Sequence, residues 1–136
     1  MNICLRFWIE KDGKHLMGKG GYEILKAIKE HGSISKASKE LGMSYRFVWN
    51  YIRRIENVLG GKVVISKKGG VEGGETHLTD LGLRLIKMFE RYERLFESVL
   101  DGVKGVVEAV NDSEVTVRVD GKFKKGDKVL IINLSG

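Results

Sequence analysis

The sequence predicts an α+β fold, and three patterns carry that prediction. Two helical segments meet at a glycine within residues 33–59, two strands flank a glycine-rich stretch within 63–78, and an apolar heptad repeat runs through 79–100. Helix, turn, helix and then a two-stranded wing is the element order of a winged helix-turn-helix. We therefore expect residues 1–100 to form such a domain and 101–136 to form a separate small all-β module.

Residues 33–59 contain local signals for both helices and for the turn between them. The hydroxyls of Ser33 and Ser44 can each accept a hydrogen bond from an unpaired N–H group, so each is expected to cap a helix. Gly42 can adopt the positive φ that the tight turn needs. In the second helix, apolar residues recur at steps of four, three and four. This spacing predicts one buried stripe, made of Val48, Ile52, Ile55 and Leu59.

The segment before the helix-turn-helix is expected to form a hairpin and one helix. Apolar and polar residues alternate over 3–9, and Asp12 followed by Gly13 indicates a hairpin turn. We interpret the glycines within 18–21 as a flexible joint. Periodic apolar residues then predict a helix over 22–30.

A wing and a long helix are expected after the helix-turn-helix. Residues 63–65 and 76–78 are predicted to be strands that flank a glycine-rich tip within 68–75. Thr79 then supplies a cap for a dimerisation helix predicted over 79–100. Its apolar residues alternate steps of four and three, as in a helix that packs against a second copy. The expected dimerisation residues are Leu85, Met88, Phe89, Tyr92, Leu95, Phe96 and Val99.

The C-terminal module is expected to contain three strands. Alternating residues predict these strands over 103–110, 115–119 and 129–134. A unit this small is marginally stable in isolation. We therefore expect it to pair with a second copy or to pack on the long helix.

Charge is distributed unevenly along the chain. Residues 1–100 carry 18 Lys and Arg against 12 Asp and Glu, whereas 101–136 carry six of each, so the first region holds the whole net charge of +6. A basic excess confined to a helix-turn-helix suggests a polyanionic partner. The alternative is a basic surface that is simply solvated.

A few other sequence features indicate the cellular compartment of the protein. Cys4 is the single cysteine, which excludes an internal disulfide and fits a reducing compartment. No apolar run approaches the length of a membrane span, and the first residues do not resemble a signal peptide. We expect a cytoplasmic protein with no membrane partner.

One face of the second helix, residues 44–59, carries the chemistry of a DNA-reading surface. Arginine can bind guanine and asparagine can bind adenine in the major groove, while other polar residues contact phosphates. We expect double-stranded DNA to be bound by Ser33, Ser35, Ser44, Tyr45, Arg46, Trp49, Asn50, Arg53, Lys67 and Lys68.

The same residues have a simpler interpretation. In this alternative Trp49 covers a neighbouring helix, the polar residues form a solvated face, and Lys67 and Lys68 protect a strand edge from further pairing. A third alternative is an architectural DNA protein without sequence preference. The variety of side chains on the helix, rather than lysine alone, favours specific recognition over that third case.

Enzyme and metal functions have little support in the sequence. His15, His31 and His77 lie far apart and have no partner at metal-ligand spacing. Residues 69–74 lack the Gly-Lys-Ser/Thr ending of a phosphate-binding loop. No nucleophile motif or carboxylate pair is recognisable, so we predict no catalytic residues and no metal site.

These motifs together resemble the N-terminal domain of ModE, the family of molybdate-responsive transcription regulators. The resemblance covers about residues 3–100 and rests on Gly-Ser-Ile-Ser at 32–35, Gly-Met-Ser-Tyr-Arg at 42–46, Trp49, the wing, and Leu78-Thr79. The Gly-Ser-Ile-Ser segment alone also fits LysR-type domains. The resemblance implies a winged-helix DNA-binding domain that forms a homodimer through its long helix.

The C-terminal part is similar to a fragment of the β-barrel that binds molybdate or tungstate in that family. The similarity rests on residues 105–110 and 125–129. The Thr-x-x-Ser motif and the Ser-Ala-Arg-Asn segment of that barrel are absent here. We therefore assign no cofactor; molybdate or tungstate is what the resemblance implies, and an oxyanion-binding protein is the alternative function.

Overall fold

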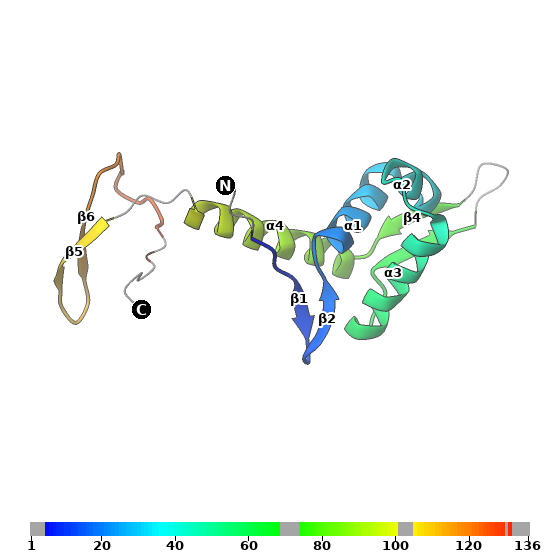
Figure 1. Cartoon of the computed structure of the whole chain (residues 1–136), viewed down its shortest axis with the longest axis horizontal. Helices are drawn as coiled ribbons and strands as arrows, with labels where there is room; N and C mark the ends of the chain where they lie inside the picture. Colours follow the sequence, from blue (N-terminus) through cyan, green and yellow to red (C-terminus); the bar gives the residue numbers. More distant parts are fainter. Residues whose placement is uncertain (1–4, 69–73, 101–104, 130, 132–136) are drawn as a thin grey trace. The chain divides into compact units, whose positions relative to one another are not determined.

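The computed structural model describes residues 5–68, 74–100, 105–129 and 131. The chain divides into two compact units, Met1–Glu97 and Ser98–Gly136. The first unit contains a hairpin, three helices, a two-stranded wing and most of a long helix (Figure 1). The described part of the second unit contains the end of that helix and one hairpin.

The predicted N-terminal hairpin is confirmed. Strand β1 (Ile9–Lys11) pairs with antiparallel strand β2 (Lys14–Met17). The turn residues Asp12 and Gly13 have φ of 52° and 71°. Two successive positive φ values are what a two-residue hairpin turn requires. The first strand begins later than predicted, since residues 5–8 have no strand conformation.

The predicted flexible joint is wrong. Helix α1 (Lys19–His31) begins within the glycine-rich segment rather than at residue 22, and Gly21 is buried. A Cβ atom on Gly21 would lie 2.7 Å from the Met17 Cβ and 2.8 Å from a ring carbon of Tyr51. Glycine is therefore needed for close packing of α1 on its neighbours, and a joint is not formed.

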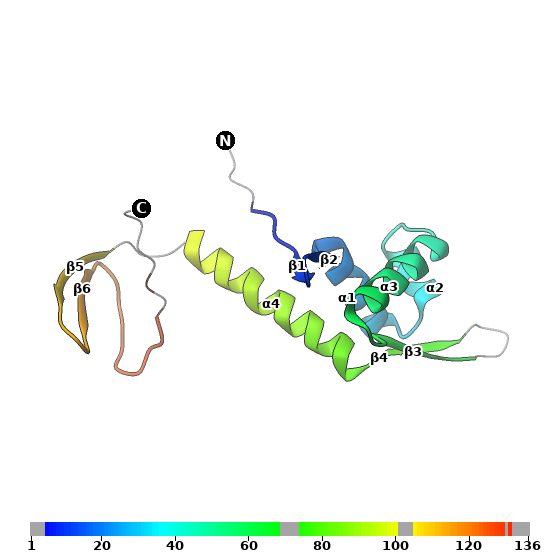
Figure 2. The same cartoon turned by 90° about the horizontal axis from the view of Figure 1, so that it is seen from below.

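Helices α2 (Ile34–Glu40) and α3 (Tyr45–Leu59) form the predicted helix-turn-helix. Gly42 between them has φ of 64°, as the turn required. Helix α2 packs against both α1 and α3 (Figure 2). The predicted stripe of α3 faces the interior, where Val48, Ile52 and Ile55 are buried and Leu59 is half-buried.

The wing strands follow α3 and pair as predicted. Strand β3 (Val64–Lys67) lies antiparallel to β4 (Glu75–Leu78) in a continuous register. The amide of Thr76 donates to the carbonyl of Gly32 over 2.8 Å, which attaches β4 to the end of α1. The predicted tip residues 69–73 lie outside the described residues.

Helix α4 (Asp80–Leu100) begins at the predicted cap. The Thr79 hydroxyl accepts from the amide of Gly82 over 3.2 Å and donates to the carbonyl of Lys62 over 2.7 Å. One side chain therefore caps α4 and holds it against the start of the wing.

A single core fills the first unit. Three rings stack within it: Phe89 of α4 lies between Phe7, at 4.5 Å, and Tyr22, at 4.8 Å between centroids. The Tyr22 hydroxyl also donates to Glu90 over 3.1 Å. The apolar residues with least exposure are Leu16, Met17, Ile24, Leu25, Ala27, Ile28, Ala37, Val48, Ile52, Ile55, Val63, Leu85, Ile86 and Phe89.

The described part of the second unit contains two of the three predicted strands. Strand β5 (Gly105–Val110) pairs with antiparallel strand β6 (Val115–Val119) around a turn where Asn111 accepts from the amides of Ser113 and Glu114. Val129 and Ile131 have no strand conformation, and the rest of the predicted third strand lies outside the described residues.

Candidate nucleic-acid interface

Helices α2 and α3 each begin at a serine that caps the helix. The Ser44 hydroxyl accepts from the amide of Phe47 over 3.1 Å, and the Ser33 hydroxyl accepts from the amide of Lys36 over 3.3 Å. Both bonds satisfy amides that a helix leaves unpaired at its first turn. Because the apolar stripe of α3 is buried, its opposite face is turned outward.

That outward face carries the predicted row of aromatic and basic side chains. Tyr45 is 53% exposed and Trp49 is 41% exposed. The Arg53 guanidinium lies over the Trp49 ring, 4.9 Å from its centroid, which favours one orientation of both side chains. Arg46 and Asn50 are exposed beside this row. The structure thus brings five of the predicted DNA-binding residues onto one helix face.

The three predicted serines differ in their surroundings. Ser33 and Ser44 use their hydroxyls to cap helices, as described above. Ser35 is exposed on α2, and its carbonyl accepts from the Ser38 hydroxyl over 2.8 Å. A direct role of these serines in DNA binding stays a prediction.

The two predicted wing lysines are exposed. Lys67 is the last residue of β3 and pairs in register with Glu75, and Lys68 follows it directly. The end of β3 therefore carries two adjacent positive charges. Contact of either lysine with DNA stays a prediction.

Glu56 is a polar residue of this site that no sequence pattern indicates. Its side chain is only 6% exposed, and its Oε2 atom lies 2.7 Å from Lys62 Nζ and 3.3 Å from Arg53 Nη1. Its Oε1 atom accepts from the amide of Val63 over 3.1 Å. One carboxylate therefore joins α3 to the residues that begin the wing.

The protonation of Glu56 reflects a balance of opposing effects. Burial acts to raise the pKa of the carboxyl, but hydrogen bonds from Lys62 and from the Val63 amide, together with the charge of Lys62, outweigh it and lower the pKa below 4.5. The carboxylate is therefore ionised at neutral pH. Its negative charge offsets one of the two cations beside it.

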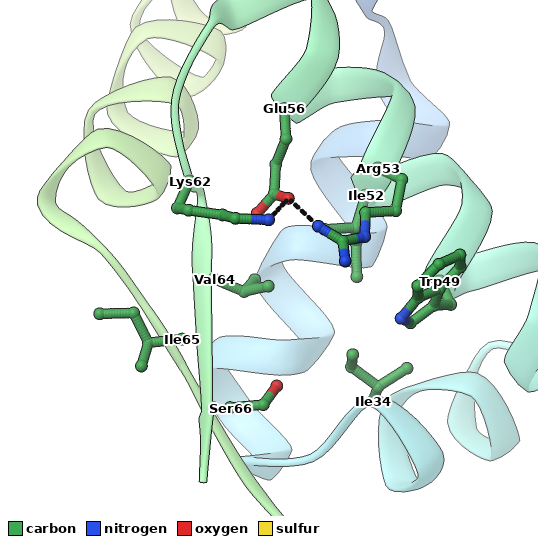
Figure 3. A pocket seen from close by; sticks show the side chains of 9 residues that line it. All are labelled: Ile34, Trp49, Ile52, Arg53, Glu56, Lys62, Val64, Ile65 and Ser66. Atoms are coloured by element: carbon green, nitrogen blue, oxygen red, sulfur yellow. Dashed lines mark hydrogen bonds and ion pairs between the residues drawn. The ribbon is translucent and has the colours of Figure 1, made fainter.

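A groove of about 390 Å³ lies between α3 and β3 (Figure 3). In the figure Lys62, Glu56 and Arg53 gather at one end of the groove, and Trp49 lies at its side, next to Arg53. Apolar residues and one serine complete the lining, namely Ile34, Ile52, Val64, Ile65 and Ser66. The groove thus lies between the predicted recognition helix and the wing.

Residues 21–83 match the family model of the bacterial regulatory helix-turn-helix proteins, lysR family. The molybdenum transport protein ModE of Azotobacter vinelandii is 33% identical over 92 residues, which is 68% of this chain and 34% of that protein. The transcriptional regulator ModE of Yersinia pestis is 34% identical over 82 residues, 60% of this chain and 31% of that protein. The N-terminal part of this chain is a ModE-like helix-turn-helix domain.

Further relatives extend these findings. The molybdenum-pterin-binding protein MopA of Rhodobacter capsulatus is 30% identical over 101 residues, 74% of this chain and 38% of that protein. The chain spans about a third of the length of the curated relatives it matches. Among solved structures, ArgP from Mycobacterium tuberculosis has a TM-score of 0.46 at 21% identity, covering 60% of this chain and 28% of that chain.

The predicted dimerisation residues of the ModE-like domain differ in how far they are exposed. Leu85 and Phe89 are buried in the core of their own chain, and Leu95 and Phe96 are half-buried. Phe96 lies 5.0 Å from Phe7 between ring centroids. The exposed members of the predicted set are Met88, Tyr92 and Val99.

Within 5–68, 74–100, 105–129 and 131, no three His, Cys, Asp or Glu residues come together as metal ligands. No helix in that part of the chain is long and apolar enough to cross a membrane.

Proposed function

We propose that this chain is a sequence-specific regulator of transcription, rather than an enzyme, and that it binds double-stranded DNA as a homodimer. Helix α3 would enter the major groove and the wing would contact the backbone. The outward row of Tyr45, Trp49 and Arg53, with Arg46 and Asn50 beside it, is the observation that carries this proposal.

The composition of this row favours recognition of sequence over general DNA binding. Arginine and asparagine can each form paired hydrogen bonds with one base edge in the major groove. Residues near the start of a recognition helix are those that reach bases, and Arg46 and Asn50 occupy its first two turns. An architectural protein without sequence preference would need cations alone.

A homodimer is supported by the apolar residues that α4 leaves uncovered. Met88 and Tyr92 are each 44% exposed and Val99 is 41% exposed, all on one long helix. In a symmetric dimer, two recognition helices would bind half-sites about 34 Å apart, or a multiple of that spacing. The names of the ModE relatives agree with a regulatory role.

Selection from a random duplex library tests the proposal directly. We expect the full chain to enrich a pseudo-palindromic site and to bind it at least about a thousandfold more tightly than random duplex at the same salt concentration. Equal affinity for both would leave only the architectural alternative. Sedimentation of the free chain at micromolar concentration should give a dimer, and a monomer would contradict that part of the proposal.

A further inference from the structure

The groove between α3 and β3 has two cations at one end that share a single oxygen atom. Lys62 and Arg53 both contact Oε2 of Glu56, at 2.7 Å and 3.3 Å (Figure 3). Lysine and arginine side chains this close would otherwise repel each other and move apart in solvent. The buried carboxylate between them removes that repulsion and keeps both cations at the groove.

We propose that Arg53 and Lys62 together bind one backbone phosphate of DNA in this groove, and that Glu56 is the positioning residue that holds them there. This inference rests on the proposed function, because it places a second class of contact beside the base-reading residues. It assigns Lys62 and Glu56, which no sequence pattern marked, to the DNA interface.

The charge of the cluster matches one phosphate. Two cations and one carboxylate leave a single positive charge, which is the charge needed to neutralise a phosphodiester. Lysine has three N–H donors and arginine has five. Each of the two side chains donates one hydrogen bond to Glu56, so further N–H donors remain for phosphate oxygens.

The position of Arg53 on α3 also favours a phosphate over a base. Arg53 follows Tyr45 by eight residues, so it lies in the third turn of α3, whereas base contacts come from the first turns of a recognition helix. Lys62 immediately precedes the wing segment and is 59% exposed. The groove between these two elements is where a DNA backbone would pass from helix to wing.

Glu56 is held too firmly to act as an ordinary surface carboxylate. It is buried, and its second oxygen accepts from the Val63 amide over 3.1 Å. The carboxylate therefore cannot rotate away from the two cations without losing its hydrogen bond from the Val63 amide. Through Glu56, Arg53 of α3 is therefore held near Lys62 and Val63, the residues just before β3.

Salt dependence of DNA binding tests the two cations. Lys62→Ala and Arg53→Ala should each lower the slope of log K against log salt concentration by about 0.9 in magnitude. Affinity for the selected site and for random duplex should fall by similar factors, because phosphates carry no sequence information. Lys29→Ala, an equal charge change at an exposed position of α1, should leave the slope unchanged.

Glu56→Gln tests the positioning role, because simple electrostatics and positioning predict opposite signs. Removal of a negative charge near DNA should strengthen binding, whereas loss of the holding carboxylate should weaken it. We expect about threefold weaker binding on both duplexes. Glu23→Gln makes the same charge change on exposed α1 and should bind as wild type or slightly better. In an Arg53→Ala/Lys62→Ala background, Glu56→Gln should weaken binding no further.

The outcomes separate this inference from the proposed function. Unchanged salt slopes in Lys62→Ala and Arg53→Ala, with intact sequence preference, would overturn the phosphate site alone. Glu56→Gln that folds and binds as tightly as wild type, or more tightly, would overturn the positioning role. If Glu56→Gln does not fold, the two exposed alanine variants still decide the phosphate site. A wild-type chain that binds no duplex would overturn the proposed function and this inference together.

Discussion

The two units of this chain contain similar β-branched residues but use them differently. In the ModE-like domain, Val48 and Val63 are completely buried. In the described hairpin of the second unit, Val106 is 59% exposed and Val110 is 70% exposed. Burial of apolar surface is the main source of folding stability, so the same residue type stabilises one unit and contributes little to the other. We therefore expect the second unit to depend on a partner surface.

The largest expected difference between the units is in stability. Phe89→Ala should lower the free energy of unfolding by about 3–5 kcal/mol, because it removes a fully buried ring that is stacked on two others. Val107→Ala, at a 51% exposed position of β5, should change it by about 0.5 kcal/mol or less. Denaturant titration of the two variants measures both values. Equal losses would show that the second unit folds around a core of its own.

A smaller effect is expected at the base-reading residues. Arg46→Ala or Asn50→Ala should cost about 1–3 kcal/mol on the selected duplex and less on random duplex. Fluorescence anisotropy at fixed salt concentration measures this difference. Thermal unfolding should remain as in wild type, because both side chains are exposed. Losses of equal size on both duplexes would instead assign these residues to the DNA backbone.

The pH dependence of the free energy of unfolding should show the titration of the Glu56 carboxyl. Since the pKa of its carboxyl is lower in the folded chain than the ordinary 4.5, its stabilising contribution is complete above pH 4.5 and is lost as the pH falls through the folded value. Glu56→Gln should remove this contribution. Denaturant titrations at pH 7 and at successive values below 4.5 should therefore bring the two proteins closer in stability as the pH falls. A constant difference between them would contradict the assignment.

The smallest expected effect is that of oxyanions on the second unit. We expect no submicromolar binding of molybdate or tungstate to the full chain, since the two sequence motifs of the barrel site are absent. Calorimetric titration with each anion measures this. Tight binding would show that residues 105–131 form an oxyanion site that neither the hairpin nor the motifs indicate.

Local features of the fold could be predicted well from the sequence. The caps at Ser33 and Ser44, the turn at Gly42 and the hairpin at Asp12 each depend on residues a few positions apart. A capping bond or a positive φ is decided within that distance. The outward row of α3 was also predicted, because a helix with one buried stripe has only one other face to expose.

Features that depend on distant residues could not be predicted in this way. Gly21 packs against Tyr51, 30 positions later in the chain. Since the local sequence does not show this contact, the glycine-rich segment resembles a flexible joint. Leu85 and Phe89 fit a dimer seam by spacing, but Phe7 and Tyr22 cover Phe89 within the same chain. Helical periodicity identifies an apolar face without saying which surface covers it.

Glu56 illustrates the same limit for a charged residue. It follows the buried Ile55 on α3, where a carboxylate is usually solvated. Its burial becomes favourable only because Lys62 and the Val63 amide return to it after the turn. No spacing rule within the helix contains that information.

The tight approach at Gly21 has a consequence for how this domain can evolve. Only a hydrogen atom fits between α1 and the ring of Tyr51, so the spacing of α1 and α3 is fixed by the absence of one methyl group. Any larger residue would collide with the Met17 Cβ as well as with the Tyr51 ring, so one of these neighbours would have to move. New DNA preferences can therefore arise by exchange of the exposed residues of α3, while Gly21 itself is closed to variation.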